Sequence, residues 1–281
     1  MSDPLRVGFI GLGSQGAPMA RRIVGAGFET TLWARRPAAL EPFADTPARS
    51  AGSIAELAAA SDLVCLCVVD DVDVEQVGAE VLSGLRPGGI VAVHSTVHPD
   101  TCRRLAGRAR AQGVQVLDAP VSGGGRAADQ GTLLVLVGGD GEVLDTCRPV
   151  FETYGDPVVH LGPTGSGQLA KLLNNLLFTA QLGLAADVLE IGGRLGLDRE
   201  GLGRFLPQGS SASFAMERVV DAGGTLDRIS AHAGKLLAKD VRLFEGLATE
   251  AAEGAVEGAA EGAGQGPTRE AARAALRAMG L

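Results

Sequence analysis

The sequence has no excess of positive charge. Its 33 aspartates and glutamates outnumber its 25 lysines and arginines, so the formal net charge of the 281 residues is −8. Proteins that bind nucleic acid neutralise phosphates with clustered Lys and Arg, and the short pairs Arg21-Arg22 and Arg35-Arg36 are too small to reverse the acidic balance. We therefore expect no nucleic-acid partner.

Metal-ligating residues are also scarce, with four cysteines and four histidines in the whole chain. Cys65 and Cys67 are two residues apart in an apolar run, but no second pair follows at the spacing of a zinc site. His94 and His98 lack a third ligand nearby in the sequence. We expect no metal site and no disulfide framework, with the cysteines present as buried reduced thiols.

Signals for export and membrane insertion are missing as well. Residues 1–11 lack the basic region, long apolar core and small-residue cleavage site of a signal peptide, which favours a cytoplasmic location. The long apolar stretch from about 168 to 195 is interrupted too often by polar groups to be a membrane span. These groups are Lys171, Asn174, Asn175, Gln181, Asp187 and Glu190.

Short β-branched runs alternate with segments of helical length from residue 5 to about 162. Several of the runs are apolar throughout, as is typical of parallel strands that helices cover on both faces. This alternation predicts an α/β domain, residues 1–163, with a doubly wound and mostly parallel sheet. The predicted strands are 5–10, 30–34, 63–69, 89–95, 114–120, 133–139 and 157–162.

The pattern changes after residue 163. A much longer helix is predicted from about 168 to 195, and its nearly all-round apolar surface suits the core of an all-helical second domain, residues 164–281, or a subunit interface. Residues 250–266 repeat Gly and Glu every four positions, which predicts either a frayed or disordered segment or a helix whose glycine row allows close approach to another helix. A final short helix is expected over 268–281.

The first predicted strand runs directly into a glycine-rich turn with the spacing Gly-x-Gly-x-x-Gly. In a dinucleotide-binding turn the first glycine makes a tight bend, the second lets the backbone approach a pyrophosphate, and the third lets the following helix pack on the strand. The alternative is that the glycines only shape a tight turn. The predicted cofactor-binding residues of this turn are Gly11, Leu12, Gly13, Ser14, Gln15 and Gly16.

Arg35 and Arg36 follow the second predicted strand, at the position where an acidic residue would bind the adenosine ribose of NAD. No acid stands there, and Arg guanidinium groups suit the extra phosphate of NADP. NADP(H) is therefore favoured over NAD(H), unless the two arginines are ordinary surface residues.

Two further segments indicate a substrate site. Ser122, Gly123 and Gly124 follow a predicted strand, and their N–H and hydroxyl groups suit a carboxylate, although the same glycines also suit a flexible loop. Lys171 and Asn175 are four residues apart, hence on one face of the predicted long helix. An ammonium among leucines is poorly solvated and suited to proton transfer, whereas the alternative is a lysine that reaches water at a helix start.

Four segments together resemble the β-hydroxyacid dehydrogenase family, which includes 3-hydroxyisobutyrate dehydrogenase and tartronate semialdehyde reductase. They are GFIGLGSQGAPMA, DAPVSGG, GPTGSGQLAKLLNN and AKDV, in the family's order and spacing. The resemblance implies a Rossmann-type N-terminal domain, a long interdomain helix and a helical C-terminal domain that commonly forms a homodimer. It also implies hydride transfer between a nicotinamide and a small carboxylated substrate, a 3-hydroxy acid or a semialdehyde.

The resemblance also assigns roles to single residues. Lys171 is similar to the family's catalytic lysine, which handles the hydroxyl proton, and Asn175 is similar to its partner at the substrate. Ser122, Gly123 and Gly124 match the segment that binds the substrate carboxylate. The further residues implied on the cofactor side are Val68, Val69, Thr96 and Lys239.

Some positions depart from the family pattern. Gln15 replaces the usual Met, Val69 replaces the usual Pro, and the Phe commonly found ahead of the Lys-Asp pair is missing. These departures leave the substrate open. An imine reductase, a related branch that usually carries Asp or Tyr in place of Lys171, is one alternative, and a non-catalytic NADPH-binding protein is another. Candidate pocket residues, which core packing explains equally well, are Phe205, Phe214 and Met216.

Overall fold

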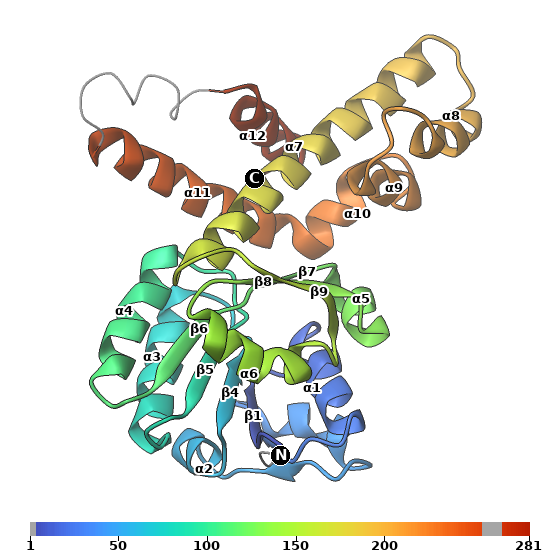
Figure 1. Cartoon of the computed structure of the whole chain (residues 1–281). Coiled ribbons are helices and arrows are strands. Elements are labelled where there is room, and N and C mark those ends of the chain that lie inside the picture. Colours follow the sequence, from blue (N-terminus) through green and yellow to red (C-terminus); the bar gives the residue numbers. More distant parts are fainter. Residues whose placement is uncertain (1–3, 255–265) are drawn as a thin grey trace. The chain divides into compact units, whose positions relative to one another are not determined.

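The computed structural model describes residues 4–254 and 266–281. The chain divides into two compact units, Met1–Lys171 (unit 1) and Leu172–Leu281 (unit 2). The division falls within α7 (Ser166–Arg194), the longest of the described helices (Figure 1). The sequence pattern places the domain boundary slightly earlier, between residues 163 and 164.

Unit 1 contains a six-stranded sheet in the order β3-β2-β1-β4-β5-β6, and every neighbouring pair of strands is parallel. The strands β1, β4 and β5 are buried at every position, which explains their unbroken apolar sequences. The predicted Rossmann-type, mostly parallel sheet is confirmed. The strands are β1 (Val7–Ile10), β2 (Thr30–Trp33), β3 (Arg49–Ser50), β4 (Leu63–Leu66), β5 (Ile90–Val93) and β6 (Gln115–Asp118).

Helices cover both faces of this sheet. Alternate strand residues point to two apolar cores: Cys65 packs in the core shared with α1 and α6, and Val64 packs in the core shared with α2, α3 and α4. The chain is therefore doubly wound, as predicted. The helices are α1 (Gly16–Gly25), α2 (Ile54–Ala59), α3 (Asp71–Gly84), α4 (Pro99–Arg110) and α6 (Gly141–Phe151), and a 3₁₀ helix spans Pro37–Phe43.

Two of the predicted strands belong to a separate three-stranded sheet of unit 1. Here β7 (Val121–Ser122) pairs antiparallel with β8 (Leu133–Val137), and β8 pairs parallel with β9 (Gly155–His160). The helix α5 (Gly124–Gln130) connects β7 to β8. The chain reverses after β6, and an antiparallel bridge between Asp118 and Gly138 joins the ends of β6 and β8. This junction places the segment around Ser122 beside the carboxyl end of the large sheet.

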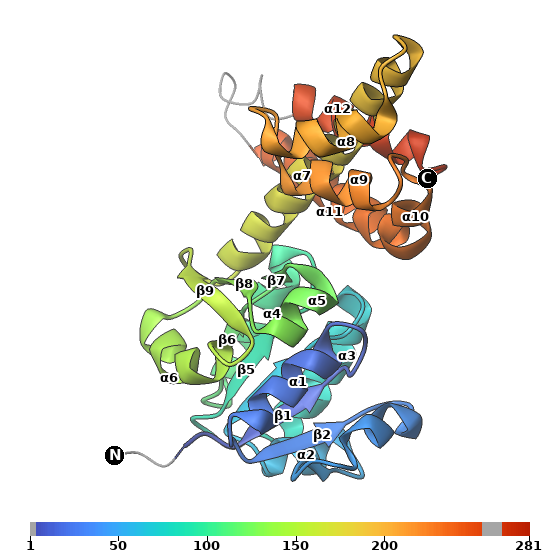
Figure 2. The same cartoon turned by 90° about the vertical axis from the view of Figure 1, so that its right-hand side faces the viewer.

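Every regular element among the described residues of unit 2 is a helix or a helical turn (Figure 2). Its apolar core joins α7 to the later helices and includes Leu182, Val219 and Leu237. The predicted final helix is present as α12, whereas residues 255–265 of the Gly/Glu repeat lie outside the described residues. The elements are α8 (Arg199–Phe205), a 3₁₀ turn (Leu206–Gln208), α9 (Phe214–Asp221), α10 (Asp227–Ile229), a π-helical turn (Ser230–Gly234), α11 (Lys235–Gly254) and α12 (Pro267–Ala278).

The helix α7 is long and apolar enough to cross a membrane by length and composition, with a mean hydropathy of 1.3 in its most apolar stretch. Core helices of globular proteins meet the same criterion, and 44% of that stretch is buried inside the protein. The polar residues Lys171, Asn175 and Thr179 are among the buried ones. The expectation that the protein has no membrane span and a cytoplasmic location stays a prediction.

Candidate active site

The turn between β1 and α1 has the shape that a dinucleotide requires. Gly11 has a φ of +100°, and a Cβ built there would lie 2.1 Å from the carbonyl oxygen of Cys67. A Cβ on Gly16 would lie 2.0 Å from the carbonyl oxygen of Gly11, whereas the space around Gly13 is open to 4 Å. The three glycines therefore fit a bend, an open approach and a close helix contact, in that order, and the residues present suit a pyrophosphate at the start of α1.

Arg35 and Arg36 lie just after β2 and are exposed. The Arg35 guanidinium donates a 2.7 Å hydrogen bond to the Asp73 carboxylate in the first turn of α3, and this bond raises the pKa of Arg35. An acidic group is thus present near the end of β2 after all, although it comes from another element. No local pattern in the sequence points to Asp73, because it lies 38 positions away from Arg35 in the chain.

The loops after β4 and β5 lie side by side. The backbone N–H of Val68 donates to the Ser95 hydroxyl at 2.8 Å, while Val69 is 63% exposed. Slightly further along the chain, Asp71 at the start of α3 accepts hydrogen bonds from the His98 N–H at 2.8 Å and from the Thr101 hydroxyl at 2.6 Å. The loop that carries Thr96 is therefore tied to the segment that carries Val68 and Val69.

The glycine loop at residues 122–125 lies against the glycine turn. Gly123 and Gly124 have φ values of +129° and +74°, and a Cβ on Gly125 would lie 2.9 Å from the Ser14 carbonyl oxygen. The space around Gly124 is open to 4 Å. Unit 1 thus brings the predicted carboxylate-binding loop next to the predicted pyrophosphate turn.

Lys171 is 8% exposed, and two buried side chains hold the helix start that carries it. The Asp118 carboxylate accepts hydrogen bonds from the N–H groups of Gly165 at 2.6 Å and Gln168 at 2.9 Å. The Gln168 amide donates to the Ser95 carbonyl oxygen at 2.8 Å and accepts from the Val97 N–H at 3.0 Å. Three of the predicted site segments, around Thr96, Ser122 and Lys171, therefore meet within unit 1.

Two features of its surroundings act on the pKa of Asp118 in opposite directions. Burial raises the pKa of this carboxyl, and the backbone N–H groups at the start of α7 act in the other direction. Neither Asp118 nor Gln168 is among the site residues predicted from the sequence. The sequence signal that could have found Asp118 is a charged residue at the end of an apolar strand. For Gln168 the only signal is its position one turn before Lys171.

The remaining predicted residues lie in unit 2. The Asn175 amide donates a 2.6 Å hydrogen bond to the Asp240 carboxylate, and both side chains are buried. The Lys239 ammonium lies 3.2 Å from the other Asp240 oxygen. Of the candidate pocket residues, Met216 packs in the core of unit 2, while Phe205 and Phe214 are 64% and 58% exposed.

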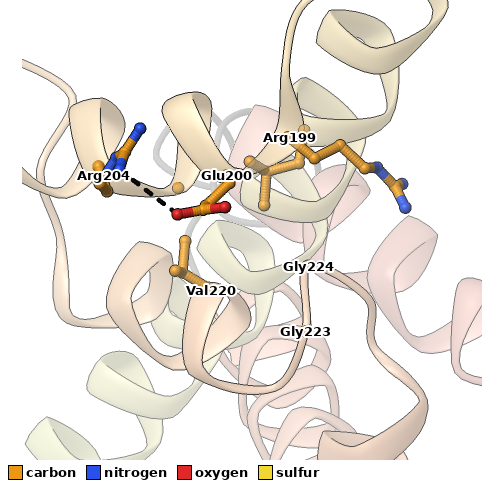
Figure 3. A pocket seen from close by; sticks show the side chains of 8 residues that line it. Arg199, Glu200, Arg204, Val220, Gly223 and Gly224 are labelled. Carbon is orange, nitrogen blue, oxygen red and sulfur yellow. Dashed lines mark hydrogen bonds and ion pairs between the residues drawn. The ribbon is translucent and has the colours of Figure 1, made fainter.

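A surface hollow of about 360 Å³ in unit 2 is lined by α8, α9 and the end of α7, with Arg204 and Glu200 paired at its rim (Figure 3). Within residues 4–254 and 266–281, no group of three or more His, Cys, Asp or Glu side chains could hold a metal ion. The cysteines are free thiols, and burial raises the pKa of Cys67 and of Cys147 to about 12.

His94 has a structural place next to the site. Both ring nitrogens form hydrogen bonds. Nδ1 lies 2.7 Å from the Ala119 carbonyl oxygen, and Nε2 lies 3.2 Å from the Tyr154 hydroxyl. A carbonyl oxygen only accepts, so Nδ1 carries the proton and the Tyr154 hydroxyl donates to Nε2. This arrangement suits the neutral ring, and burial lowers the pKa of His94 to about 4.

Two protein families match the chain, one for each part. Residues 6–162 match the NAD binding domain of 6-phosphogluconate dehydrogenase. Residues 165–264 match the NAD-binding region of NADP-dependent 3-hydroxyisobutyrate dehydrogenase. The NAD-dependent L-serine dehydrogenase of Pseudomonas aeruginosa is 33% identical over 260 residues, which cover 89% of this chain and 86% of that protein.

Solved structures show the same architecture. The 3-hydroxyisobutyrate dehydrogenase of Mycobacterium tuberculosis, solved with L-serine, has a TM-score of 0.78 and 27% identity over 93% of this chain and 92% of that one. Psf3 in complex with NADP+ and 2-OPP has a TM-score of 0.81 and 25% identity over 96% of this chain and 93% of that one.

Proposed function

The chain belongs to the β-hydroxyacid dehydrogenase family, and on that premise we propose that it interconverts a small 3-hydroxy acid and its semialdehyde with NADP(H), using Lys171 as general acid and base. Membership makes it a nicotinamide-dependent oxidoreductase of hydroxy acids. The cofactor preference, the role of Lys171 and the substrate are our proposals. One observation carries the role of Lys171: hydrogen bonds tie the helix start before it to the loop at Thr96 and to Asp118, four residues before Ser122.

The glycine loop supports a substrate carboxylate. Ser122 supplies a hydroxyl, consecutive glycines expose backbone N–H groups, and the space where a Gly124 side chain would lie is open. Relatives named for L-serine and 3-hydroxyisobutyrate act on small carboxylates with a hydroxyl two carbons from the carboxyl. We place the carboxylate of a compound of this class at residues 122–124. Asn175 is proposed separately as a further substrate-binding residue.

Lys171 supports the proton step. When bound, a nicotinamide exchanges hydride with the carbinol carbon of the substrate. Lys171 would take the hydroxyl proton during oxidation and return a proton to the carbonyl oxygen during reduction. Its burial suits an amine to this role, because little water surrounds it. The helix α7 also carries Asn175 four positions later, on the same face.

The preference for NADP(H) rests on the exposed guanidinium groups of Arg35 and Arg36 after β2. Arg binds phosphate through paired N–H groups, so either residue can reach an added phosphate on the ribose. The Arg35 guanidinium is hydrogen-bonded to the Asp73 carboxylate, so Asp73 would compete with the ribose phosphate for Arg35. Further cofactor contacts are proposed for Val68, Val69, Thr96 and Lys239.

A homodimer is proposed from one face of α7. Its large apolar side chains recur at spacings of three, four or seven residues and stay between 43% and 56% exposed along the middle of the helix. A stripe of this kind suits a second copy of the chain, and the mass of the protein in solution tests it. The stripe is formed by Leu173, Leu177, Leu184, Val188 and Ile191.

The proposal is tested by NADPH and NADH consumption with a panel of small carboxylated aldehydes and, in parallel, cyclic imines. We expect turnover of a semialdehyde with NADPH. The comparison is between wild type, Lys171→Ala and Lys235→Ala, in which an exposed lysine of α11 serves as the matched control. Equal rates in wild type and Lys171→Ala would contradict the catalytic assignment. Turnover of imines alone would contradict the substrate class.

A further inference from the structure

We propose that Gln168 and Asp118 are positioning residues that set the place of Lys171 relative to Thr96 and Ser122. The inference rests on the proposed function, since it takes Lys171 and Thr96 to lie at the reacting end of the site. Neither residue is assigned a contact with substrate or cofactor. Each acts through the segment that it holds.

Gln168 clamps the backbone on both sides of Thr96. Its amide nitrogen donates to the Ser95 carbonyl oxygen at 2.8 Å, and its amide oxygen accepts from the Val97 N–H at 3.0 Å. The side chain is 0% exposed, so water does not compete for these bonds. Because both ends of the amide are used, the loop at Thr96 has a fixed distance from the first turn of α7.

Asp118 holds the same turn from the other side. Its two oxygens accept from the N–H groups of Gly165 at 2.6 Å and Gln168 at 2.9 Å, and it is 0% exposed. A carboxylate at this place satisfies backbone donors that a helix start leaves open and suits the positive end of the helix dipole. Asp118 ends β6, and the chain reaches Ser122 only four residues later.

Close packing leaves this junction little freedom. A Cβ on Gly167 would lie 2.4 Å from the Leu136 carbonyl oxygen, and a Cβ on Gly138 would lie 2.6 Å from an Asp118 carboxylate oxygen. The first turn of α7 therefore lies directly on the strand ends. The missing side chains of Gly138 and Gly167 permit this close contact.

The arrangement predicts an effect on turnover more than on cofactor binding. Without the Gln168 amide, Asp118 still caps α7, but the Thr96 loop loses its tie to the helix that carries Lys171. The glycine turn at 11–16 keeps its own contacts. A misplacement of reacting groups by about 1 Å can lower a rate by about 100-fold, so even a small shift at this junction would be measurable.

The first experiment uses Gln168→Met, which keeps the length of the side chain and removes its hydrogen bonds. We expect kcat with the preferred substrate to fall about 10- to 100-fold, while the Kd for NADPH stays within about threefold. Hydrogen exchange at the Val97 amide is expected to rise because its acceptor is lost. The matched control is Ser61→Ala, which removes another buried hydrogen bond before β4 and should leave kcat unchanged.

A double variant tests whether Gln168 acts through Lys171. If it does, Gln168→Met combined with Lys171→Ala is no slower than Lys171→Ala alone. Multiplied effects would overturn the inference, and so would a Gln168→Met enzyme with wild-type kcat and a more labile Val97 amide. Lys171→Ala with wild-type kcat would instead overturn the proposed function. If Gln168→Met does not fold, Gln168→Asn keeps an amide that is too short to reach both partners, and the same outcomes apply.

Asp118 is tested separately by Asp118→Asn, which keeps one acceptor oxygen and replaces the other with a donor. We expect kcat to fall in the same direction, with faster exchange at the Gly165 or Gln168 amide. Unchanged kcat with faster exchange at either amide would remove Asp118 from the inference, because its contacts would then serve stability alone.

Discussion

The two units bury polar side chains in different ways. In unit 1, buried His94, Ser95, Asp118 and Gln168 gather at the carboxyl ends of β5 and β6 and bond to the backbone of other segments. In unit 2 the buried polar set among the described residues is small and lies inside an apolar bundle. It consists of Asn175, Thr179 and Asp240.

The difference follows from the architecture. Parallel strands bring segments far apart in sequence to one edge, where loops meet and their polar groups must find partners. Packed helices mainly join apolar faces. We therefore expect polar substitutions to change chemistry in unit 1, apolar substitutions to change stability in unit 2, and Asp240 to be the exception in unit 2.

The largest effect on stability is expected for Leu182→Ala. Leu182 is 0% exposed in the core of unit 2, and its truncation should lower the free energy of unfolding by about 2–5 kcal/mol. Denaturant titration followed by circular dichroism measures this loss. The Kd for NADPH should change little, and the exposed Leu236→Ala serves as the control. A large loss of NADPH binding by the folded variant would break the contrast between the units.

The second effect is an acid sensitivity of unit 1 through His94. Burial lowers its pKa from 6.5 to about 4, so between these pH values the unfolded chain binds a proton that the folded chain does not. The free energy of unfolding should therefore fall by about 3 kcal/mol as pH drops through this window.

His94→Leu should lose that part of the pH dependence, measured by denaturant titration at several pH values. The exposed His232→Ala should keep it. An unchanged pH slope in His94→Leu would show that other groups cause the acid sensitivity.

A smaller effect is expected for Asp240→Ala. The variant removes the carboxylate that accepts a 2.6 Å hydrogen bond from the Asn175 amide and holds this amide in place. Loss of a hydrogen bond to a charged group should lower the free energy of unfolding by about 1.5–3 kcal/mol, and kcat/KM should fall by about tenfold if Asn175 meets the substrate. The exposed Asp187→Ala is the control. Unchanged kcat/KM would confine Asp240 to a structural role.

The smallest effect concerns the exposed Arg35. Arg35→Ala should weaken NADPH binding by about tenfold, or about 1.4 kcal/mol, and leave NADH binding unchanged. Asp73→Asn should strengthen NADPH binding by freeing the guanidinium. Arg49→Ala, which removes another exposed arginine paired with an acid, is the control. Equal losses for the two cofactors would contradict a phosphate contact.

Much of unit 1 could be predicted from the sequence because its signals are local. Unbroken apolar runs marked the parallel strands, and the glycine spacing marked the tight turn at Gly11. The smaller sheet was harder to predict. Its strand β8 has the same apolar character as the strands of the large sheet, and only the reversal after β6 separates it from them.

The missed residues share a different property. Asp73, Asp118, Gln168 and Asp240 act on partners brought close by folding, in most cases dozens of positions away. No local spacing announces such a pairing. In the same way, the tie between the loops of Thr96 and Val68 depends on β4 and β5 being neighbours in the sheet.

The central claim is that Lys171 moves the substrate proton. The most direct measurement is kcat of Lys171→Ala with the preferred semialdehyde and NADPH, with and without added methylammonium. We predict a fall of about 100- to 10,000-fold, with NADPH binding retained and the rate partly restored in proportion to the added cation. A Lys171→Ala enzyme that keeps the kcat of wild type would contradict the account.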